Sequence, residues 1–314
     1  TANIENKNFS WHSNFVFSLN RNKVVSLDSE TGSLPQTVQI GSETATVTNT
    51  RVGQPIGQFW GYKVIGRFDK PEDFWYKDAN GNVKQVALPE GAKIATSPTS
   101  GGVFIGDYIY EDINGDGVID NNDQTFIGNP EPKFTFGFGN TFSYKGFDLS
   151  FQFSGSYGNK IMNYGKRFLN ITGSTSNQLT EVMDYARLAK YDENGPDDYR
   201  NYYVVNTGTI MPRLSTESGV NKNNRVSDAY VEDGSYIRLQ NIALSYTLPR
   251  KWLSHTFLNN VKLYCNVQNV FTITKYDGFD PEVGSMRGNA LLNGVDYSRY
   301  PSPRIYTFGV NVQF

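Results

Sequence analysis

The sequence has 314 residues and a formal net charge of −2, and charged residues make up 19% of it. No basic field is present to attract nucleic acid, which excludes nucleic acid as a partner. Low charge together with 30 glycines, 20 tyrosines and 21 phenylalanines favours a β-rich chain with one apolar face. No apolar run reaches the ~18 residues that a transmembrane helix needs.

The chain has one cysteine and two histidines, which excludes an internal disulfide and a zinc site of the usual spacing. Cys265 falls on an apolar strand face, so we expect it to be packed and inert. Thr1 leads almost directly into a strand and no signal peptide precedes it. Either processing removed the start, or the sequence is a piece of a longer protein.

The first strand alternates apolar and polar residues from Phe9 to Asn20. Weaker alternation predicts short strands at 24–27 and 46–52, with a loop between them at 28–45. A clearer strand spans 59–68. Residues 69–130 lack sustained periodicity, so we expect a long loop with some structure of its own.

The strongest pattern is a hairpin of 134–144 and 147–157 about Lys145-Gly146. Phenylalanines occupy one face of each strand, and Gly, Ser, Thr, Asp and Gln occupy the other. A water-soluble sandwich shows the reverse, an apolar inner face and a charged outer face. The hairpin therefore predicts a wet interior on one side and lipid on the other.

A second long loop is expected over 159–230, with one helix over 179–190 where apolar residues have helical spacing. Residues 236–248 form a strand whose apolar phase slips, which predicts a β-bulge near Gln240-Asn241. Strands follow at 261–273 and 304–314, separated by a third long loop at 274–303.

The strand order assigns sides of a membrane. If Phe314 ends on the periplasmic side, the turns at 145–146 and 249–260 are periplasmic. The loops at about 69–130, 159–230 and 274–303 are then extracellular. Short turns on one side and long loops on the other are typical of outer-membrane β-barrels. We therefore predict an all-β fold, an antiparallel transmembrane β-barrel.

The inner face of these strands is too small to fill a closed barrel of about eight strands. The strands are therefore expected to form part of a wall of larger radius, completed by strands outside this sequence. A small barrel plugged by its own loops is the alternative.

Residues 112–123, D-I-N-G-D-G-V-I-D-N-N-D, have the spacing of a calcium-binding loop. The oxygen ligands expected for Ca²⁺ are Asp112, Asn114, Asp116, the carbonyl of Val118, Asp120 and Asp123. Gly117 permits the sharp turn that such a loop requires. The last ligand of such a loop is usually a Glu that binds the ion through both carboxylate oxygens. Here it is Asp123, whose shorter side chain extends less far toward the ion. An Asx-rich turn without an ion is the alternative, and in both cases the loop is structural, not catalytic.

No catalytic site is expected. The carboxylate pairs Asp107/Glu111 and Asp197/Asp198 have the chemistry of a glycosidase, but they lie among many polar loop residues and read as surface charge. Several loop tyrosines could stack on sugars or peptides, or pack against a partner; they are Tyr199, Tyr202, Tyr203, Tyr297 and Tyr300. No substrate-binding residue is assigned.

A set of short motifs, in this order, resembles the C-terminal part of the SusC/RagA-type TonB-dependent transporters. The motifs are W-H-S-N-F-V-F-S-L-N at 11–20, N-K-V-V-S-L at 22–27, G-Q-P-I-G-Q-F-W-G-Y at 53–62, D-I-N-G-D-G at 112–117, I-G-N-P at 127–130, G-S-Y-I-R-L-Q-N at 234–241 and N-V-Q-N-V-F at 266–271. Each motif is weak alone, but the ordered set is specific and covers the whole chain.

The resemblance implies a 22-stranded barrel in the bacterial outer membrane, with a plug domain inside that is not in this chain. It implies import of oligosaccharides or peptides, a SusD-like surface lipoprotein as lid, and energy from the TonB complex. Phe314 resembles the terminal residue read by the outer-membrane insertion machinery. Two other functions remain as alternatives. A calcium-binding surface adhesin would show sequence repeats and the hydrophobic pattern of a soluble β-sandwich, which this sequence lacks. An enzyme with its site on a loop would need a catalytic motif, and none is found.

Overall fold

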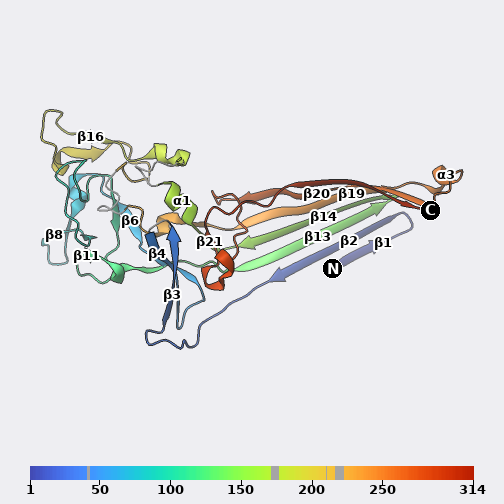
Figure 1. The fold of residues 1–314 in the computed structure, drawn as a ribbon, viewed down its shortest axis with the longest axis horizontal. Helices are drawn as coiled ribbons and strands as arrows, with labels where there is room; N and C mark the ends of the chain where they lie inside the picture. The colour runs from blue at the N-terminus through green and yellow to red at the C-terminus, as the bar shows by residue number, and fades with distance from the viewer. Residues whose placement is uncertain (41–42, 171–176, 210, 216–222) are drawn as a thin grey trace.

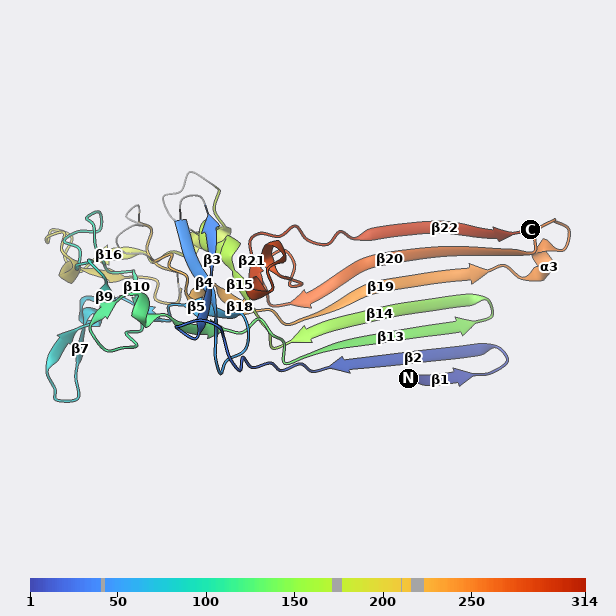
Figure 2. The ribbon, with the colours of Figure 1, turned by 60° about the horizontal axis from the view of Figure 1, so that its bottom comes forward.

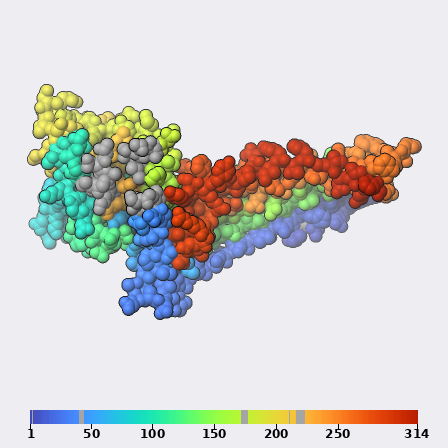
Figure 3. All heavy atoms as spheres, viewed as in Figure 1, coloured from blue at the N-terminus to red at the C-terminus, as the bar shows by residue number. Residues whose placement is uncertain are grey.

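The computed structural model describes residues 1–40, 43–170, 177–209, 211–215 and 223–314. The molecule has two parts: a long antiparallel sheet, and an assembly of long connecting segments gathered at one end of it (Figures 1 and 2). In the space-filling view the sheet is a narrow wall that projects from the bulkier assembly (Figure 3).

The wall is a seven-stranded sheet in the order β1-β2-β13-β14-β19-β20-β22. Its strands are β1 (Ala2–Glu5), β2 (Phe9–Ser18), β13 (Phe134–Tyr144), β14 (Phe147–Tyr157), β19 (Tyr236–Thr247), β20 (Asn260–Thr274) and β22 (Ile305–Gln313). Every neighbouring pair is antiparallel. β1 and β22 lie at opposite edges, so the described strands form an open sheet and not the small closed barrel considered above.

Register places the apolar residues of all these strands on one side, here called the apolar face. Phe142 lies opposite Trp11 on β2 and Leu149 on β14, and Leu149 lies opposite Leu244. Aromatic residues on this face remain open, for example Phe308, which is 78% exposed. The opposite side, the polar face, carries Gly, Ser, Thr, Asn and Gln. The two-residue period of a strand produces this separation.

The predicted β-bulge is confirmed. Pairing shifts register between Gln152 and Phe153 of β14 where β19 passes from Asn241 to Leu239. A second shift between Leu239 and Asn241 occurs against β20, where Asn269 has φ +52°. The extra residue keeps Ile237 and Leu239 on the same face as Ile242.

The two ends of the wall differ, as predicted. One end has the tight turn Lys145-Gly146, with φ of +46° and +89°, and the connection that contains α3 (Arg250–Leu253). The three long segments predicted as loops gather at the other end (Figure 2). Residues 19–58 extend the same assembly.

The assembly is built from short elements. Its first elements are β3 (Ser33–Ile40), β4 (Glu43–Arg51), β5 (Gln58–Gly61), β6 (Val64–Arg67), η1 (Pro71–Phe74), β7 (Trp75–Lys77), β8 (Val83–Gln85), β9 (Leu88–Pro89), β10 (Tyr108–Tyr110), β11 (Val118–Ile119), η2 (Asn121–Asp123) and β12 (Thr125–Gly128). The remainder are β15 (Lys160–Asn163), α1 (Tyr164–Leu169), η3 (Thr180–Asp184), β16 (Leu188–Lys190), η4 (Tyr199–Asn201), β17 (Tyr202–Val204), η5 (Asp228–Tyr230), β18 (Val231–Asp233), η6 (Met286–Gly288), η7 (Ala290–Leu292) and β21 (Val295–Asp296).

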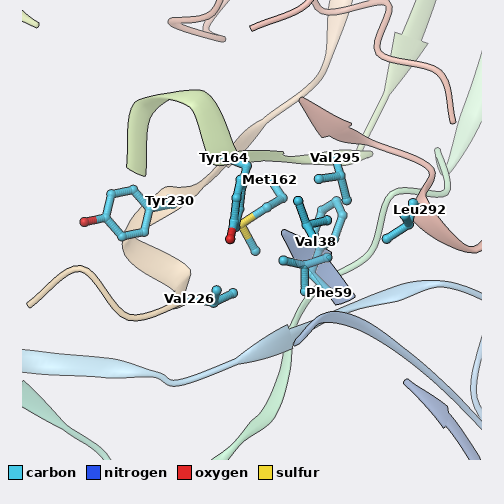
Figure 4. Packing of buried hydrophobic residues seen from close by; sticks show 9 residues of the cluster. Val38, Phe59, Met162, Tyr164, Val226, Tyr230, Leu292 and Val295 are labelled. Carbon is cyan, nitrogen blue, oxygen red and sulfur yellow. The ribbon is translucent and has the colours of Figure 1, made fainter. Parts of the chain in front are cut away.

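Most of the buried apolar residues lie in this assembly; Leu239, Val261 and Leu253 are buried in the wall and its short-turn end. One cluster brings together residues that are far apart in the sequence, among them Val38, Phe59, Met162 and Val295 (Figure 4). A second cluster surrounds Phe68, Phe74 and Phe104, and a third holds Ile119 among tyrosines. The long segments are thus a packed unit and not independent loops.

Four local predictions are wrong. Residues 28–45 contain β3, which pairs with β4, and residues 24–27 form no strand. The strand expected over 59–68 is broken into β5 and β6, which pair with β12 and β10. The helix expected over 179–190 is a single 3-10 turn, η3, followed by β16. Part of the second long segment, 171–176, 210 and 216–222, lies outside the described residues.

Among the described residues, no helix combines the length and the apolar character needed to cross a membrane.

Candidate functional site

The predicted calcium loop connects β10 to β12 and is held by its own side chains. Asp112 accepts hydrogen bonds from the backbone N–H groups of Gly115 (2.7 Å) and Gly117 (2.8 Å). Asn114 accepts from the N–H of Asp116, and Asp116 from that of Val118. Gly115 and Gly117 have φ of +76° and +86°, which only glycine adopts freely. The loop curls around its carboxylates.

The last predicted ligand, Asp123, closes the loop from inside. It is fully buried and accepts from the N–H of Ile113 (2.9 Å) and of Asp120 (2.8 Å). Asp120 in turn caps η2 through the N–H of Asn122. Val118 lies in β11, which pairs in parallel with β9. Asp123 therefore ties the two ends of the loop together through backbone hydrogen bonds.

Within the part of the chain that the structure describes, no group of three or more His, Cys, Asp or Glu side chains is arranged to hold a metal ion. The predicted calcium ligands also include the Asn114 amide oxygen and the Val118 carbonyl oxygen, which are of other chemical types. Calcium binding stays a prediction.

The carboxylate pairs considered for hydrolysis are each engaged by a cation. Asp197 pairs with Lys190 at 2.7 Å and Asp198 with Arg200 at 2.7 Å, both at the surface. Glu111 pairs with Lys63 at 2.9 Å. Such pairs neutralise the carboxylates rather than preparing two of them for acid–base chemistry.

Asp107 is buried and joins segments far apart in the sequence. Its Oδ1 accepts from Arg213 Nε at 2.8 Å and from Asn223 Nδ2 at 2.9 Å. Arg213 also donates to the carbonyl of Pro98 at 2.7 Å. Both charges are at least 97% buried, so each requires the other.

A cavity of about 310 Å³ lies beside this pair, between α1, η3, residues 208–209 and 211–215, and residues 223–230. Arg213 and Lys166 reach its wall. Lys166 Nζ contacts Glu181 (2.8 Å), Asp277 (3.3 Å) and Glu232 (3.4 Å). Burial by itself would lower the pKa of the Lys166 ammonium, but the three carboxylates outweigh it and raise that pKa above its usual value.

Two tyrosines in the wall of this cavity are more than nine-tenths buried, Tyr108 and Tyr230. Neither hydroxyl has a hydrogen-bond partner among the described residues. Figure 4 shows Tyr230 at the edge of its apolar cluster, with the hydroxyl directed away from that cluster. Burial raises the pKa of Tyr230 to about 12, so the hydroxyl is protonated at neutral pH.

Asn170, at the end of α1, also lines the cavity. Its amide N–H donates to Glu181, while its Oδ1 is buried without a hydrogen-bond partner. Among the described residues, one amide oxygen and two phenol hydroxyls in the cavity wall thus have no hydrogen-bond partner, and of these the Asn170 oxygen is fully buried.

Sequence reasoning missed these residues and singled out other tyrosines. Tyr199 and Tyr202 pack against the second apolar cluster. The ring centroids of Tyr203 and Tyr191 are 4.7 Å apart and those of Tyr297 and Tyr164 are 6.4 Å apart, while Tyr300 is 86% exposed. No local signal marks Tyr108 or Tyr230, because the cavity forms only when four segments pack together.

A second buried ion pair fastens the last long segment to the wall. Arg238 on β19 is 3% exposed and donates to Asp280, to Glu282 (2.8 Å) and to Thr272 (2.8 Å). Burial opposes ionisation of Asp280, but hydrogen bonds from the Glu282 N–H, Arg238 and the Ser302 N–H lower the pKa of its carboxyl. The G-S-Y-I-R motif thus meets the D-P-E sequence at 280–282.

No family model matches the chain. TonB-dependent receptor P3 of Formosa agariphila is 33% identical over 100% of the chain, and TonB-dependent receptor P39 of the same organism is 33% identical over 99%. TonB-dependent receptor SusC of Bacteroides thetaiotaomicron is 26% identical over 66% of the chain and 17% of its own length. The chain spans 28% and 29% of the lengths of the two Formosa receptors.

The fold matches a chain of the RagAB peptide transporter with a TM-score of 0.65 and 20% identity, over 99% of this chain and 28% of that chain. The relatives are receptors and transporters rather than enzymes, in agreement with the prediction that the chain carries no catalytic site. Sequence and fold agree: the chain belongs to the SusC/RagA-type TonB-dependent receptors of the bacterial outer membrane, of which it is a segment.

Proposed function

We propose that this chain forms part of the barrel wall and the extracellular loops of a TonB-dependent importer of oligosaccharides or peptides. The observation that carries the proposal is the wall with one apolar and one polar face. Tyr306 is 60% and Phe308 78% exposed on the apolar face, too much aromatic surface to leave in water. Lipid against the apolar face and a hydrated lumen against the polar face give each face a suitable environment.

The open edges support a larger barrel. β1 and β22 present unpaired backbone N–H and C=O groups, which a bilayer does not tolerate. Further strands of the same receptor, to a total of 22 in this family, would close the wall around a plug domain. Each strand of a membrane barrel needs about nine to eleven residues, and β13 and β14 have 11 each.

The partners follow from the same placement. The packed assembly at the end opposite the short turns lies on the extracellular side, where a SusD-like lipoprotein would act as the lid. The TonB complex would act from the periplasm through parts of the receptor outside this chain. The name of the RagAB neighbour supports a two-component importer. Peptide is named as the substrate of that neighbour, and we do not assign it to this chain.

Deletion of the full-length receptor gene tests this function. Loss of uptake of one class of oligosaccharide or peptide, restored by the receptor gene together with its neighbouring lipoprotein gene, is the expected result. Unchanged uptake of both classes in the deletion strain would contradict the importer. Surface proteolysis of intact cells tests the placement, since cleavage within the assembly and not at 145–146 is expected.

We further infer that residues 112–123 hold a structural calcium ion in the assembled receptor. The supporting observation is the spacing of oxygen ligands on a loop whose two glycines already have the required positive φ. The ion would brace the loop beneath the third apolar cluster, to which Ile119 anchors it. Calcium analysis of the purified receptor, described below, tests this separately from transport.

A further inference from the structure

We propose that the end of the wall that carries the turns 6–8, 145–146 and 248–259 binds the headgroups of anionic phospholipids in the periplasmic leaflet. The proposal rests on the membrane placement proposed above and goes beyond it, because it assigns a lipid class to one end of the wall. The surface consists of a row of aromatic side chains on the apolar face and of the cations in the turns beyond that row. Figure 2 shows these turns together at one end of the sheet, away from the assembly.

The last register row that β2, β13, β14 and β19 share on the apolar face is aromatic. Tyr144 lies opposite Phe9 on β2 and Phe147 on β14. Phe147 lies opposite Tyr246 on β19, with the two ring centroids 4.2 Å apart. Tyr144 and Phe147 are about half exposed. Aromatic residues of membrane barrels gather where the hydrocarbon meets the headgroups, so this row marks that boundary.

The three turns beyond the row carry cations and no carboxylate side chain. Turn 6–8 contains Lys7, turn 145–146 contains Lys145, and the connection 248–259 contains Arg250 and Lys251. All four side chains are exposed, and none forms an ion pair with a described residue. The chain as a whole has a net charge of −2, so this end differs in sign from the rest. Unpaired cations next to a membrane attract anionic lipid.

These cations lie at the depth of lipid phosphates. Lys145 directly follows Tyr144, and its Nζ atom lies 5.1 Å from the centre of the Tyr144 ring. Arg250 follows Tyr246 by four residues. A strand advances about 3.3 Å per residue, and the headgroup layer on each side of the hydrocarbon is roughly 5–8 Å thick. The charges beyond the aromatic row are therefore within reach of that layer.

The connection that contains α3 continues the apolar face beyond the strands. The ring centroid of Trp252 lies 6.5 Å from that of Tyr246, and Trp252 is 66% exposed. Phe257 in the same connection is also exposed. Exposed aromatic side chains beside Arg250 and Lys251 are the combination that segments lying in a membrane interface present. The cationic surface is thus continuous with the face that meets lipid.

Two features favour a lipid over a soluble acidic protein. The aromatic row lies directly next to the cations on the face that meets acyl chains, so one phospholipid contacts both with its two parts. The carboxylates of the adjoining strands, Glu5 and Asp148, lie on the polar face, where Asp148 pairs with Lys262 at 2.9 Å. An anionic headgroup on the apolar side therefore reaches the turns without repulsion from a carboxylate.

The test uses the full-length receptor in detergent and native mass spectrometry with added phosphatidylglycerol or phosphatidylethanolamine of equal chain length. Phosphatidylglycerol is anionic and should bind at least fivefold more tightly than the zwitterionic lipid, because one cation near an anionic surface contributes about that factor. The variant Lys145→Gln/Arg250→Gln/Lys251→Gln should lose most of this preference. The matched control, Lys70→Gln/Lys77→Gln/Lys93→Gln, removes three exposed cations of the assembly and should retain it.

Further arms separate charge from folding and lipid from free phosphate. The charge-conserving variant Lys145→Arg/Arg250→Lys/Lys251→Arg should retain the preference. Glycerol 3-phosphate should bind at least tenfold more weakly than phosphatidylglycerol, because it lacks the chains that contact the aromatic row. Equal binding of the two lipids, the same loss in the matched control or in the charge-conserving variant, or equally tight binding of glycerol 3-phosphate would each overturn the proposal.

Assembly distinguishes this inference from the membrane placement on which it rests. The amount of heat-modifiable receptor in the outer membrane is measured for the native receptor and for each variant. A native receptor that assembles normally but shows no preference for phosphatidylglycerol leaves the barrel wall standing and removes only the lipid site. A native receptor that is absent from the outer membrane would remove the placement as well.

Discussion

The indole Nε1 of Trp11 donates a hydrogen bond to Oδ1 of Asn140 at 2.8 Å, on the apolar face of the wall. The two residues lie on adjacent strands, where Asn140 is opposite Ser13 and Trp11 is opposite Phe142. Asn140 is 5% exposed, although its neighbours on the same strand face are phenylalanines. The Trp11 indole thus satisfies the Asn140 oxygen, whereas the Nδ2 group of Asn140 is buried without a hydrogen-bond partner.

Removal of either partner of this bond is expected to destabilise the receptor. Asn140→Leu leaves the indole N–H without an acceptor, and Trp11→Phe leaves the amide oxygen without a donor. The double variant should lose less than the sum, with a coupling of roughly 0.5–1.5 kcal/mol, the range found for hydrogen bonds inside membrane proteins. Chemical unfolding in detergent measures it. Trp252→Phe, in exposed α3, is the control, and a coupling of zero would contradict the role assigned to the bond.

A charge on the apolar face should prevent assembly, whereas the same charge on the polar face should be tolerated. Val310 and Asn311 are neighbours on β22 that point to opposite faces. Val310→Arg places a cation in lipid, at a cost of about 2–4 kcal/mol near the membrane midplane, while Asn311→Arg faces the lumen. The amount of heat-modifiable receptor in the outer membrane reports the difference. Equal loss in both variants would mean that the faces are assigned incorrectly.

The buried Asp107–Arg213 pair should be essential for the packing of the assembly. Asp107→Asn keeps the shape but leaves a buried guanidinium without its counter-charge, which costs about 3–5 kcal/mol. Hydrogen–deuterium exchange should therefore rise around Phe104 and Pro98 but not in the wall. Asp198→Asn, which breaks the exposed pair with Arg200, should have almost no effect. Similar exchange in the two variants would show that the buried pair is dispensable.

Acid should release the last long segment from Arg238. Because the pKa of Asp280 is lowered in the folded protein, its contribution to stability is complete above the unfolded value of about 4 and is lost as the pH falls further. Hydrogen exchange of residues 275–303, corrected for the intrinsic rate, should rise below that pH. In Asp280→Asn the acid-dependent rise should be reduced. A rise that begins near neutral pH would point to another group.

We expect about one calcium ion per receptor, and we expect its binding to depend on the loop at 112–123. Elemental analysis after dialysis is expected to find the ion in the native receptor with its lipoprotein partner, and to find it lost in Asp116→Ala. Asp78→Ala is the matched control, because Asp78 also accepts from backbone N–H groups in an Asx-rich turn, those of Asn80 and Asn82. Absence of calcium from the native complex would remove the proposal.

The wall could be predicted from sequence because each strand is recognised from the alternation of neighbouring residues. Side chains alternate along each strand, so the faces of β13, β14 and β22 and even the bulge near Gln240 followed from parity. The assembly could not be predicted in the same way. Leu188–Lys190 has helical spacing, yet it forms β16 because it pairs with Tyr202–Val204.

The sequence by itself determined a two-faced sheet with short turns at one end, because a two-residue period and turn residues depend on near neighbours. Only the tertiary structure decided where Tyr108, Asn170 and Tyr230 meet, and which cation neutralises Asp107. Arg213 is 106 positions away from that carboxylate, and no periodicity links them. Burial makes the pairing of such charges obligatory, but chain packing alone selects the partner.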